Sequence, residues 1–144
     1  MRFSTRTEYG LICLVHMVRC REGERLTVKE LVSHENYSAA YLEKIFQALK
    51  AAGIVVSFQG NQGGYALARQ PGEITLRQIV EALEGTTFDI FCERRIPDQL
   101  ICNHGSTCGL KPIWVKTKQL LDHYYDSVTL EMIGEGVGDE ARKH

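Results

Sequence analysis

The sequence predicts a mainly α-helical fold with one small β-hairpin and a long helix near the C-terminus. Apolar residues recur at helical spacing before residue 50, two short strand-like runs then flank a glycine-rich turn, and a last apolar stripe follows residue 112. The chain has 144 residues, of which 44% are hydrophobic and 24% are charged. This composition is typical of one globular domain and excludes wholesale disorder, a collagen-like repeat and a disulfide-stabilised miniprotein.

Two short helices are expected near the N-terminus. Ser4 and Thr5 are suitable N-cap residues, and four apolar residues then recur at helical spacing, namely Leu11, Leu14, Val15 and Val18. Thr27 and Glu30 have the spacing of a capping box, in which each side chain bonds the backbone N–H of the other residue. A second helix is therefore expected to begin after Thr27.

A third helix is expected between Ser38, a good N-cap, and Gly53, a natural terminator. Its apolar face consists of Leu42, Ile45, Phe46 and Leu49. Residues 54–58 and 65–68 then favour two strands around the flexible turn 60–64, which predicts a β-hairpin.

A fourth helix is expected from a second capping box, Thr75 with Gln78, to Gly85. Pro112 suits the first turn of a final long helix with one apolar side, formed by Ile113, Thr117, Leu120, Leu121, Tyr124 and Val128. Because such a face needs a partner, we expect the protein to be a homodimer. A short helix near 129–133 follows.

The order of these elements is that of a winged helix-turn-helix, whose third helix enters the DNA major groove while the hairpin contacts the flanking backbone. Residues 1–85 are therefore expected to form a winged-helix DNA-binding domain. Residues 86–111 would form a cysteine-bearing loop, 112–133 a dimerisation helix region, and 134–144 a flexible tail. Charge agrees: residues 1–70 hold nine Lys/Arg and six Asp/Glu, whereas residues 71–144 hold eight and twelve.

The outward side of the third helix and the hairpin tip contain the side chains expected to bind double-stranded DNA. Lysine can contact phosphate or guanine, glutamine can contact adenine, and glutamate can accept a hydrogen bond from cytosine. The expected DNA-binding residues are Arg2, Ser38, Tyr41, Glu43, Lys44, Gln47, Lys50, Gln59, Asn61 and Gln62. An ordinary solvated surface is the alternative interpretation.

Cys92, Cys102 and Cys108 lie in one segment without clear periodicity, separated by nine and five residues. Thiolates are ligands for iron–sulfur clusters and zinc, and a loop allows three of them to converge. Since no CxxC is present, the spacing leaves open a metal or cluster site, a thiol redox switch, and unrelated cysteines. Cys13 and Cys20 fall in the first helix and are expected to be small buried hydrophobes.

Several segments together carry a family resemblance. They are the opening Met-Arg-Phe-Ser, residues 41–46 (Tyr-Leu-Glu-Lys-Ile-Phe), residues 63–67 (Gly-Gly-Tyr-Ala-Leu), residues 74–76 (Ile-Thr-Leu) and the three loop cysteines. With these, residues 1–133 resemble the bacterial winged-helix iron–sulfur transcriptional regulators typified by IscR, NsrR, RirA and RsrR. The resemblance implies a homodimeric transcription factor whose cluster lies near the dimerisation helix and controls DNA binding.

The resemblance also implies the metal ligands, which are Cys92, Cys102, Cys108, Glu8 and His34. Glu8 matches the acidic position used by NsrR and RsrR, and His34 is similar to the RsrR histidine. The nine-residue first interval departs from the five-residue intervals of IscR and NsrR, so both a 2Fe–2S and a 4Fe–4S cluster remain open. Glu8 also completes a capping box with Thr5, which would give it a structural role instead.

The expected function is a homodimeric repressor whose iron–sulfur cluster senses redox state, nitric oxide or iron supply. The alternative is a cluster-free winged-helix regulator that uses its cysteines as a thiol switch or zinc site. An enzyme is not expected, because no G-x-S-x-G, H-E-x-x-H, P-loop or Rossmann fingerprint occurs. The longest apolar run, residues 11–18, is far shorter than a membrane helix of roughly 20 residues, so a cytoplasmic protein without membrane contact is expected.

Overall fold

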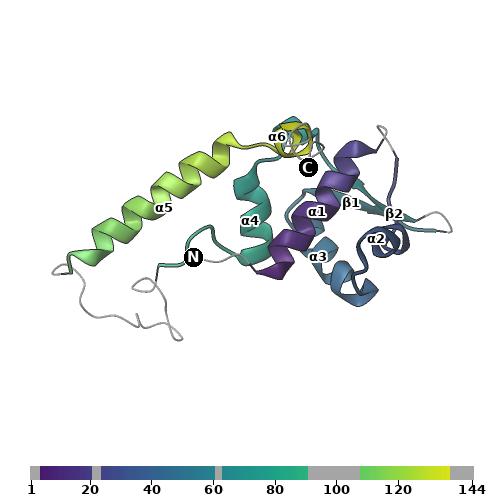
Figure 1. Cartoon of the computed structure of the whole chain (residues 1–144), viewed down its shortest axis with the longest axis horizontal. Helices are drawn as coiled ribbons and strands as arrows, with labels where there is room; N and C mark the ends of the chain where they lie inside the picture. The colour runs from purple at the N-terminus through teal and green to yellow at the C-terminus, as the bar shows by residue number, and fades with distance from the viewer. Residues whose placement is uncertain (1–3, 21–23, 61–62, 91–107, 137–144) are drawn as a thin grey trace, which may run out of the picture.

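The computed structural model describes residues 4–20, 24–60, 63–90 and 108–136, whose arrangement is shown in Figure 1. As predicted, the fold is mainly α-helical with one two-stranded sheet. Within these ranges no helix is long and apolar enough to cross a membrane. The elements in chain order are α1 (Thr5–Arg19), α2 (Val28–Glu35), α3 (Ala39–Ala51), β1 (Val55–Phe58), β2 (Gly64–Leu67), the short 3-10 helix η1 (Pro71–Glu73), α4 (Leu76–Glu84), α5 (Leu110–Ser127) and α6 (Leu130–Gly136).

Capping interactions fix the starts of α2, α3 and α4. At α2 the Glu30 backbone N–H donates to Thr27 Oγ1 at 3.1 Å, and Thr27 N–H donates to the Glu30 carboxylate at 2.8 Å. At α3 the Tyr41 N–H donates to Ser38 Oγ at 3.1 Å. Thr75 forms the expected capping box at α4. These local interactions explain why the helix starts can be predicted from the sequence.

β1 and β2 pair antiparallel, and residues 55–67 are called the wing below. Leu26, which precedes α2, adds a further backbone pairing to the wing. Leu26 N–H donates to Tyr65 O at 2.9 Å, and Tyr65 N–H donates to Leu26 O at 2.8 Å. Gly64 permits this approach, because its φ is +133° and a Cβ there would lie 2.7 Å from Leu26 O. The wing is therefore fastened to the segment ahead of α2.

The hydrophobic core lies between α1, α3, α4 and the inner side of the wing. Its fully buried side chains include Leu14, Phe46, Leu49 and Ile79. The wing joins this core through Tyr65, whose ring stacks on Phe46 with a centroid distance of 4.5 Å. The apolar stripe that identifies each of these helices in the sequence is thus the side that the fold buries.

α5 projects from the winged helix as an arm, and the C-terminal half of α5 contacts α4 (Figure 1). Arg77 of α4 forms this junction, with ion-pair distances of 2.7 Å to Glu81, 2.8 Å to Asp126 and 3.6 Å to Asp122. Thr87, three residues after α4 ends, donates to Asp122. The junction therefore connects α4, α5 and the start of the segment that leads to the loop cysteines.

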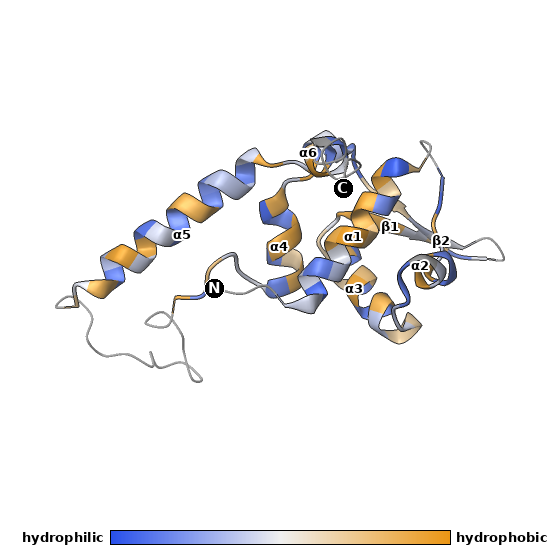
Figure 2. Ribbon diagram, in the orientation of Figure 1, coloured by the Kyte–Doolittle hydropathy of each residue, from blue (hydrophilic) through white to orange (hydrophobic). Residues whose placement is uncertain are grey.

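The other side of α5 is apolar and exposed. Figure 2 shows hydrophobic residues spaced along the arm. The large apolar side chains are exposed by 56% at Leu110, 55% at Ile113, 40% at Trp114, 59% at Leu120 and 61% at Tyr124. An apolar stripe of this length is typical of an interface with another polypeptide.

Candidate functional site

The outer side of α3 presents the polar side chains that the sequence predicts to bind DNA. Glu43, Lys44, Gln47 and Lys50 are all exposed. Within the described ranges, Lys44, Gln47 and Lys50 form no hydrogen bond or ion pair with another side chain. Their donors are therefore available for phosphate oxygens and base edges.

Glu43 is held toward the wing. Its carboxylate accepts a hydrogen bond of 3.1 Å from the Tyr65 hydroxyl. Burial raises the pKa of Tyr65, and the hydrogen bond and charge of Glu43 raise it further, so the phenol stays protonated and remains a donor. This contact fixes the position of the wing relative to the outer side of α3.

Tyr41 belongs to a cluster of aromatic rings rather than standing free. The rings of Tyr9 and Tyr37 stack with centroids 3.9 Å apart, and the Tyr41 ring meets Tyr9 edge-on at 5.7 Å. The Tyr41 hydroxyl lies 3.3 Å from Thr5 Oγ1. The cluster packs the start of α3 against the first turns of α1, while Ser38 serves as the α3 cap.

The wing contributes Gln59, which is exposed at the end of β1. A hollow of about 380 Å³, lined by Gln59, Glu43 and Thr27 among others, lies between the wing, α3 and the start of α2. Three other predicted DNA-binding residues, Arg2, Asn61 and Gln62, lie outside the described residues.

The N-terminus of α1 is capped by a distant carboxylate. Ser4 is the N-cap residue, but its own side chain caps nothing. The Glu84 carboxylate instead accepts hydrogen bonds from Ser4 N–H at 3.0 Å, from Thr7 Oγ1 at 2.6 Å, and from the Ser4 hydroxyl. The capping box between Thr5 and Glu8 is therefore not formed. The Glu8 side chain is exposed and has no partner in the described ranges.

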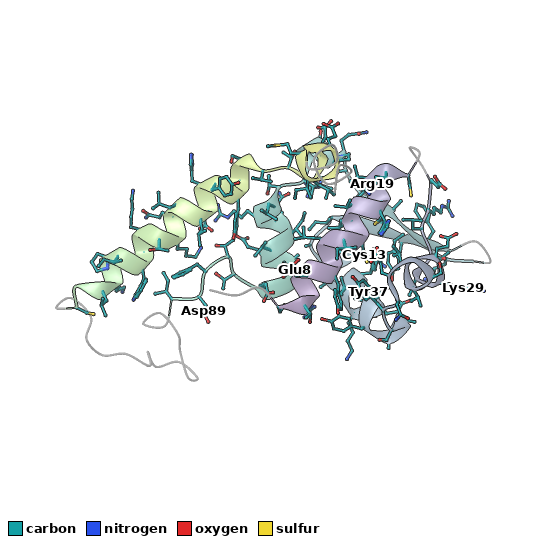
Figure 3. All side chains as sticks on the ribbon, in the orientation of Figure 1. Glu8, Cys13, Arg19, Lys29, Tyr37 and Asp89 are labelled. Carbon is teal, nitrogen blue, oxygen red and sulfur yellow. The ribbon has the colours of Figure 1, made fainter. Side chains whose placement is uncertain are left out.

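Glu84 is ionised at neutral pH. Burial alone would raise its pKa, but the hydrogen bonds from Ser4 and Thr7 and the charge of Arg6 lower it below its usual value. Figure 3 shows Glu8 at the N-terminal end of α1 and Asp89 on the segment that leads from α4 toward the loop cysteines. Glu84 thus fixes the turn that carries Glu8 against the end of α4.

Cys13, in α1, and Cys20, the C-cap residue that follows it, are structural thiols, although Cys20 is half-buried rather than buried as expected. Cys13 is fully buried, and burial together with the charge of Glu35 raises its pKa to about 12. The Cys20 thiol donates to the backbone oxygen of His16 at 3.3 Å, and burial raises its pKa. Both groups therefore stay protonated, a state that does not bind metals well.

Cys108 is described by the structure, and it is a free, half-buried thiol two residues before α5. His34 lies in the last turn of α2, but its side chain is outside the description, as are Cys92 and Cys102. In the part of the chain that is described, no three His, Cys, Asp or Glu side chains are grouped as a metal site. Glu8 and Cys108 are the described members of the predicted ligand set.

Comparison with known proteins identifies relatives of this fold and sequence. Residues 3–136 match the family model described as Rrf2, iron-dependent transcriptional regulator. The transcriptional regulator CymR of Bacillus subtilis is 30% identical over 133 residues, which cover 91% of this chain and 88% of that protein. The match spans the winged helix and continues to α6.

Solved structures give the same assignment. The structure of T. potens IscR has a TM-score of 0.72 and 27% identity, and the match covers 99% of this chain and 91% of that one. The oxidized form of Staphylococcus aureus CymR has a TM-score of 0.69 and 25% identity, covering 94% and 97%. The chain therefore belongs to the Rrf2 family and is a winged-helix, DNA-binding transcriptional regulator rather than an enzyme.

Proposed function

We propose that the chain is a homodimeric repressor that couples operator binding to an iron–sulfur cluster and so responds to redox state, nitric oxide or iron supply. The observation that carries the proposal is the Glu8 carboxylate on the winged helix, which has no partner among the described residues, in a chain that has three cysteines between α4 and the start of α5. The iron-dependent description of the family supports it.

The described residues fit such a cluster by their chemistry. Glu84 takes over the capping of α1, which leaves the Glu8 oxygens free to bind metal. Cys108 is neither in a disulfide nor fully buried, so its sulfur is accessible to a metal. We propose Cys92, Cys102, Cys108 and Glu8 as ligands, with His34 as a further ligand. A bound 2Fe–2S or 4Fe–4S cluster would supply a centre that oxidation or nitric oxide can alter.

The ligands proposed here belong to two parts of the molecule. Glu8 lies in the first turn of α1, which is part of the winged helix, whereas Cys108 lies two residues before α5. Residues that bind one metal centre together restrain the elements that carry them. Shared ligation would therefore restrain the winged helix relative to α5, and loss of ligation would release it.

The DNA interface proposed is the outer side of α3 together with the wing. The side-chain donors of Lys44, Gln47 and Lys50 have no partner among the described side chains, and Glu43 is positioned by Tyr65. α5 would pair with α5 of a second copy through its exposed apolar side, which places two α3 helices in one assembly. Two such helices imply a pseudo-palindromic operator with half-sites about 10 to 10.5 base pairs, or a small multiple of that, apart.

Metal analysis tests the cluster directly. Protein purified without oxygen should contain iron and sulfide and absorb visible light. Cys92→Ala, Cys102→Ala and Cys108→Ala should each lose most of the iron, whereas Cys20→Ala should keep it, because the Cys20 thiol is bonded to the backbone of His16 in α1. Full iron and sulfide in the Cys92 and Cys108 variants would remove the segment from the proposed site.

A thiol switch is the second candidate function. The observation in its favour is the similarity to CymR of Bacillus subtilis, which extends over 91% of this chain, and to the structure of the oxidized form of Staphylococcus aureus CymR. A protein of this kind would be colourless and iron-free when purified without oxygen. Its operator affinity would change on treatment with peroxide and return with a thiol reductant.

A further inference from the structure

The tip of the wing has no cation of its own. Residues 59–64 are Gln-Gly-Asn-Gln-Gly-Gly, which offer neutral donors only. Binding to the DNA backbone depends mainly on lysine and arginine, because each neutralised phosphate releases counterions. A cation at the wing must therefore come from another part of the chain.

Arg25 supplies a cation next to the tip of the wing. Its guanidinium carbon lies 3.7 Å from the centroid of the Phe58 ring, at the end of β1. The neighbouring Leu26 is fixed to β2 by its two backbone hydrogen bonds with Tyr65. The backbone next to Arg25 is thus anchored to the wing, and the side chain reaches the residue that precedes Gln59.

The Arg25 guanidinium keeps its hydrogen-bonding capacity. The residue is exposed, and within the described ranges it forms no hydrogen bond or ion pair. A planar guanidinium that stacks on a ring uses its face and leaves the N–H groups at its edge available. Because the ring restrains the side chain, binding a phosphate costs less conformational entropy than it would for a free arginine.

The position of Arg25 extends the proposed DNA interface. Phe58 and Gln59 line the hollow that lies between the wing and Glu43 of α3. A DNA strand that passes from α3 to the wing would therefore run beside Phe58, the residue on which Arg25 stacks.

We propose that Arg25 is a phosphate-binding residue of the wing, held by Phe58 against the DNA backbone that flanks each half-site. The proposal rests on the assignment of α3 and the wing as the DNA interface. It adds a contact from a segment that belongs to neither element, and it gives Phe58 the role of a positioning residue.

Salt dependence measures this contact. The probe is a 30-base-pair duplex selected from a random library by the wild-type protein, with affinity measured between 50 and 200 mM salt. Arg25→Met keeps an apolar cover on Phe58 but removes the charge. It should make the slope of log affinity against log salt shallower by about 0.9 per chain, or about 1.8 for a dimer. The wild type should therefore lose about 12-fold more affinity than the variant over this range.

Arg19→Met is the matched control. Arg19 is also exposed, but it lies in the last turn of α1, at the opposite end of that helix from Glu8 (Figure 3). This variant loses the same charge and should keep the wild-type slope. An unchanged slope in Arg25→Met, or an equal change in both variants, would overturn the proposal.

Phe58→Leu tests the positioning role separately. It should weaken binding in the wild-type background and have little effect when Arg25→Met is already present. Equal weakening in both backgrounds would show that Phe58 acts without Arg25. Lys44→Ala, measured in the same assay, tests whether α3 contacts the DNA. If Lys44→Ala weakens binding but Arg25→Met keeps the wild-type salt slope, the role of Arg25 is rejected and the role of α3 in DNA binding stands.

Discussion

Glu84 stabilises the N-terminus of α1 although it lies at the end of α4. The first backbone N–H groups of a helix have no internal partners, and the end of the helix carries partial positive charge. The Glu84 carboxylate accepts from one of these groups and from two hydroxyls. It thereby joins two helices and takes the capping role that Glu8 could otherwise have had.

Glu84→Gln should destabilise the protein by about 0.5 to 1 kcal/mol at pH 7, because it removes the charge at the helix end. The folded-state pKa of Glu84 is lowered, so its charge stabilises the fold above the unfolded value of about 4.3. That stabilisation disappears as the pH falls through the folded-state pKa. Urea unfolding measures this effect. The free energy of unfolding of Glu84→Gln should be lower than that of the wild type at pH 7, and the difference should be smaller at pH 3.

Glu73→Gln is the control, since the Glu73 side chain is exposed and forms no hydrogen bond or ion pair with a described residue. It should leave stability near the wild-type value at both pH values. A gap for Glu84→Gln that is equally large at pH 3 would contradict an electrostatic role.

Lys44→Ala and Gln47→Ala should each weaken binding to the selected duplex while leaving the fold intact, because both side chains point away from the core. A good bidentate base contact contributes about 1 to 3 kcal/mol of discrimination. Competition between the selected duplex and a scrambled one, at one salt concentration, measures this loss. If both variants discriminate as well as the wild type, α3 does not contact bases.

Part of the candidate site could be predicted from residue types alone. The polar side of α3 is exposed as expected, because the apolar side that defines the helix also fixes which side faces outward. The local sequence also favoured a capping box between Thr5 and Glu8, which is absent. Glu84 takes its place because tertiary packing brings α4 against α1, and sequence spacing contains no information on that contact.

At the level of elements, the wing depends on one close backbone approach. Gly64 adopts a φ of +133°, and a Cβ at this position would lie 2.7 Å from Leu26 O. Gly60 has a similar φ of +107° but nothing within 4 Å of the same position. Substitutions at these two glycines can therefore distinguish the cost of a strained φ from the cost of a clash with the Leu26 backbone.

Gly64→Ala should destabilise the protein more than Gly60→Ala does. Both substitutions cost about 1 to 3 kcal/mol of stability, because alanine is strained at a positive φ. Only Gly64→Ala also places a Cβ against the Leu26 backbone, so that the wing must move away from Leu26. Thermal unfolding and affinity for the selected duplex check the effect. Equal losses in the two variants would mean that the Leu26 pairing contributes nothing.

The elements themselves follow closely from local patterns. α2, α3 and α4 begin at their predicted caps, since a cap residue and an apolar stripe act within a few residues of each other. The pairing of Leu26 with Tyr65 and the Arg77 junction are different. They join segments far apart in the chain, so they become visible only in the folded molecule.

At the level of the whole molecule, α5 has two distinct sides. One side is tied to α4 through Arg77, Asp122 and Asp126. The opposite side exposes Leu120 and Tyr124 together with further apolar residues. A second copy that covers this side would complete the assembly that the proposed function requires.

Leu120→Glu should convert a dimer to a monomer, because it places a charge in the centre of the apolar stripe. Gln119→Glu adds the same charge at an exposed position one residue away, on the polar side of α5, and should leave the dimer intact. Sedimentation velocity measures the mass of each variant. If both variants remain dimers, the interface lies elsewhere. If the wild type is a monomer, the proposed dimer is excluded.

In the proposed function, the affinity of the chain for DNA depends on whether an iron–sulfur cluster is bound. The most direct test compares affinity for the selected duplex among cluster-loaded, oxidised and apo protein, at equal dimer concentration and salt. A coupling of about 1 to 3 kcal/mol predicts that at least one state differs from the others by roughly 5- to 150-fold. Equal affinity in all three states would contradict the sensor model while leaving the DNA-binding assignment in place.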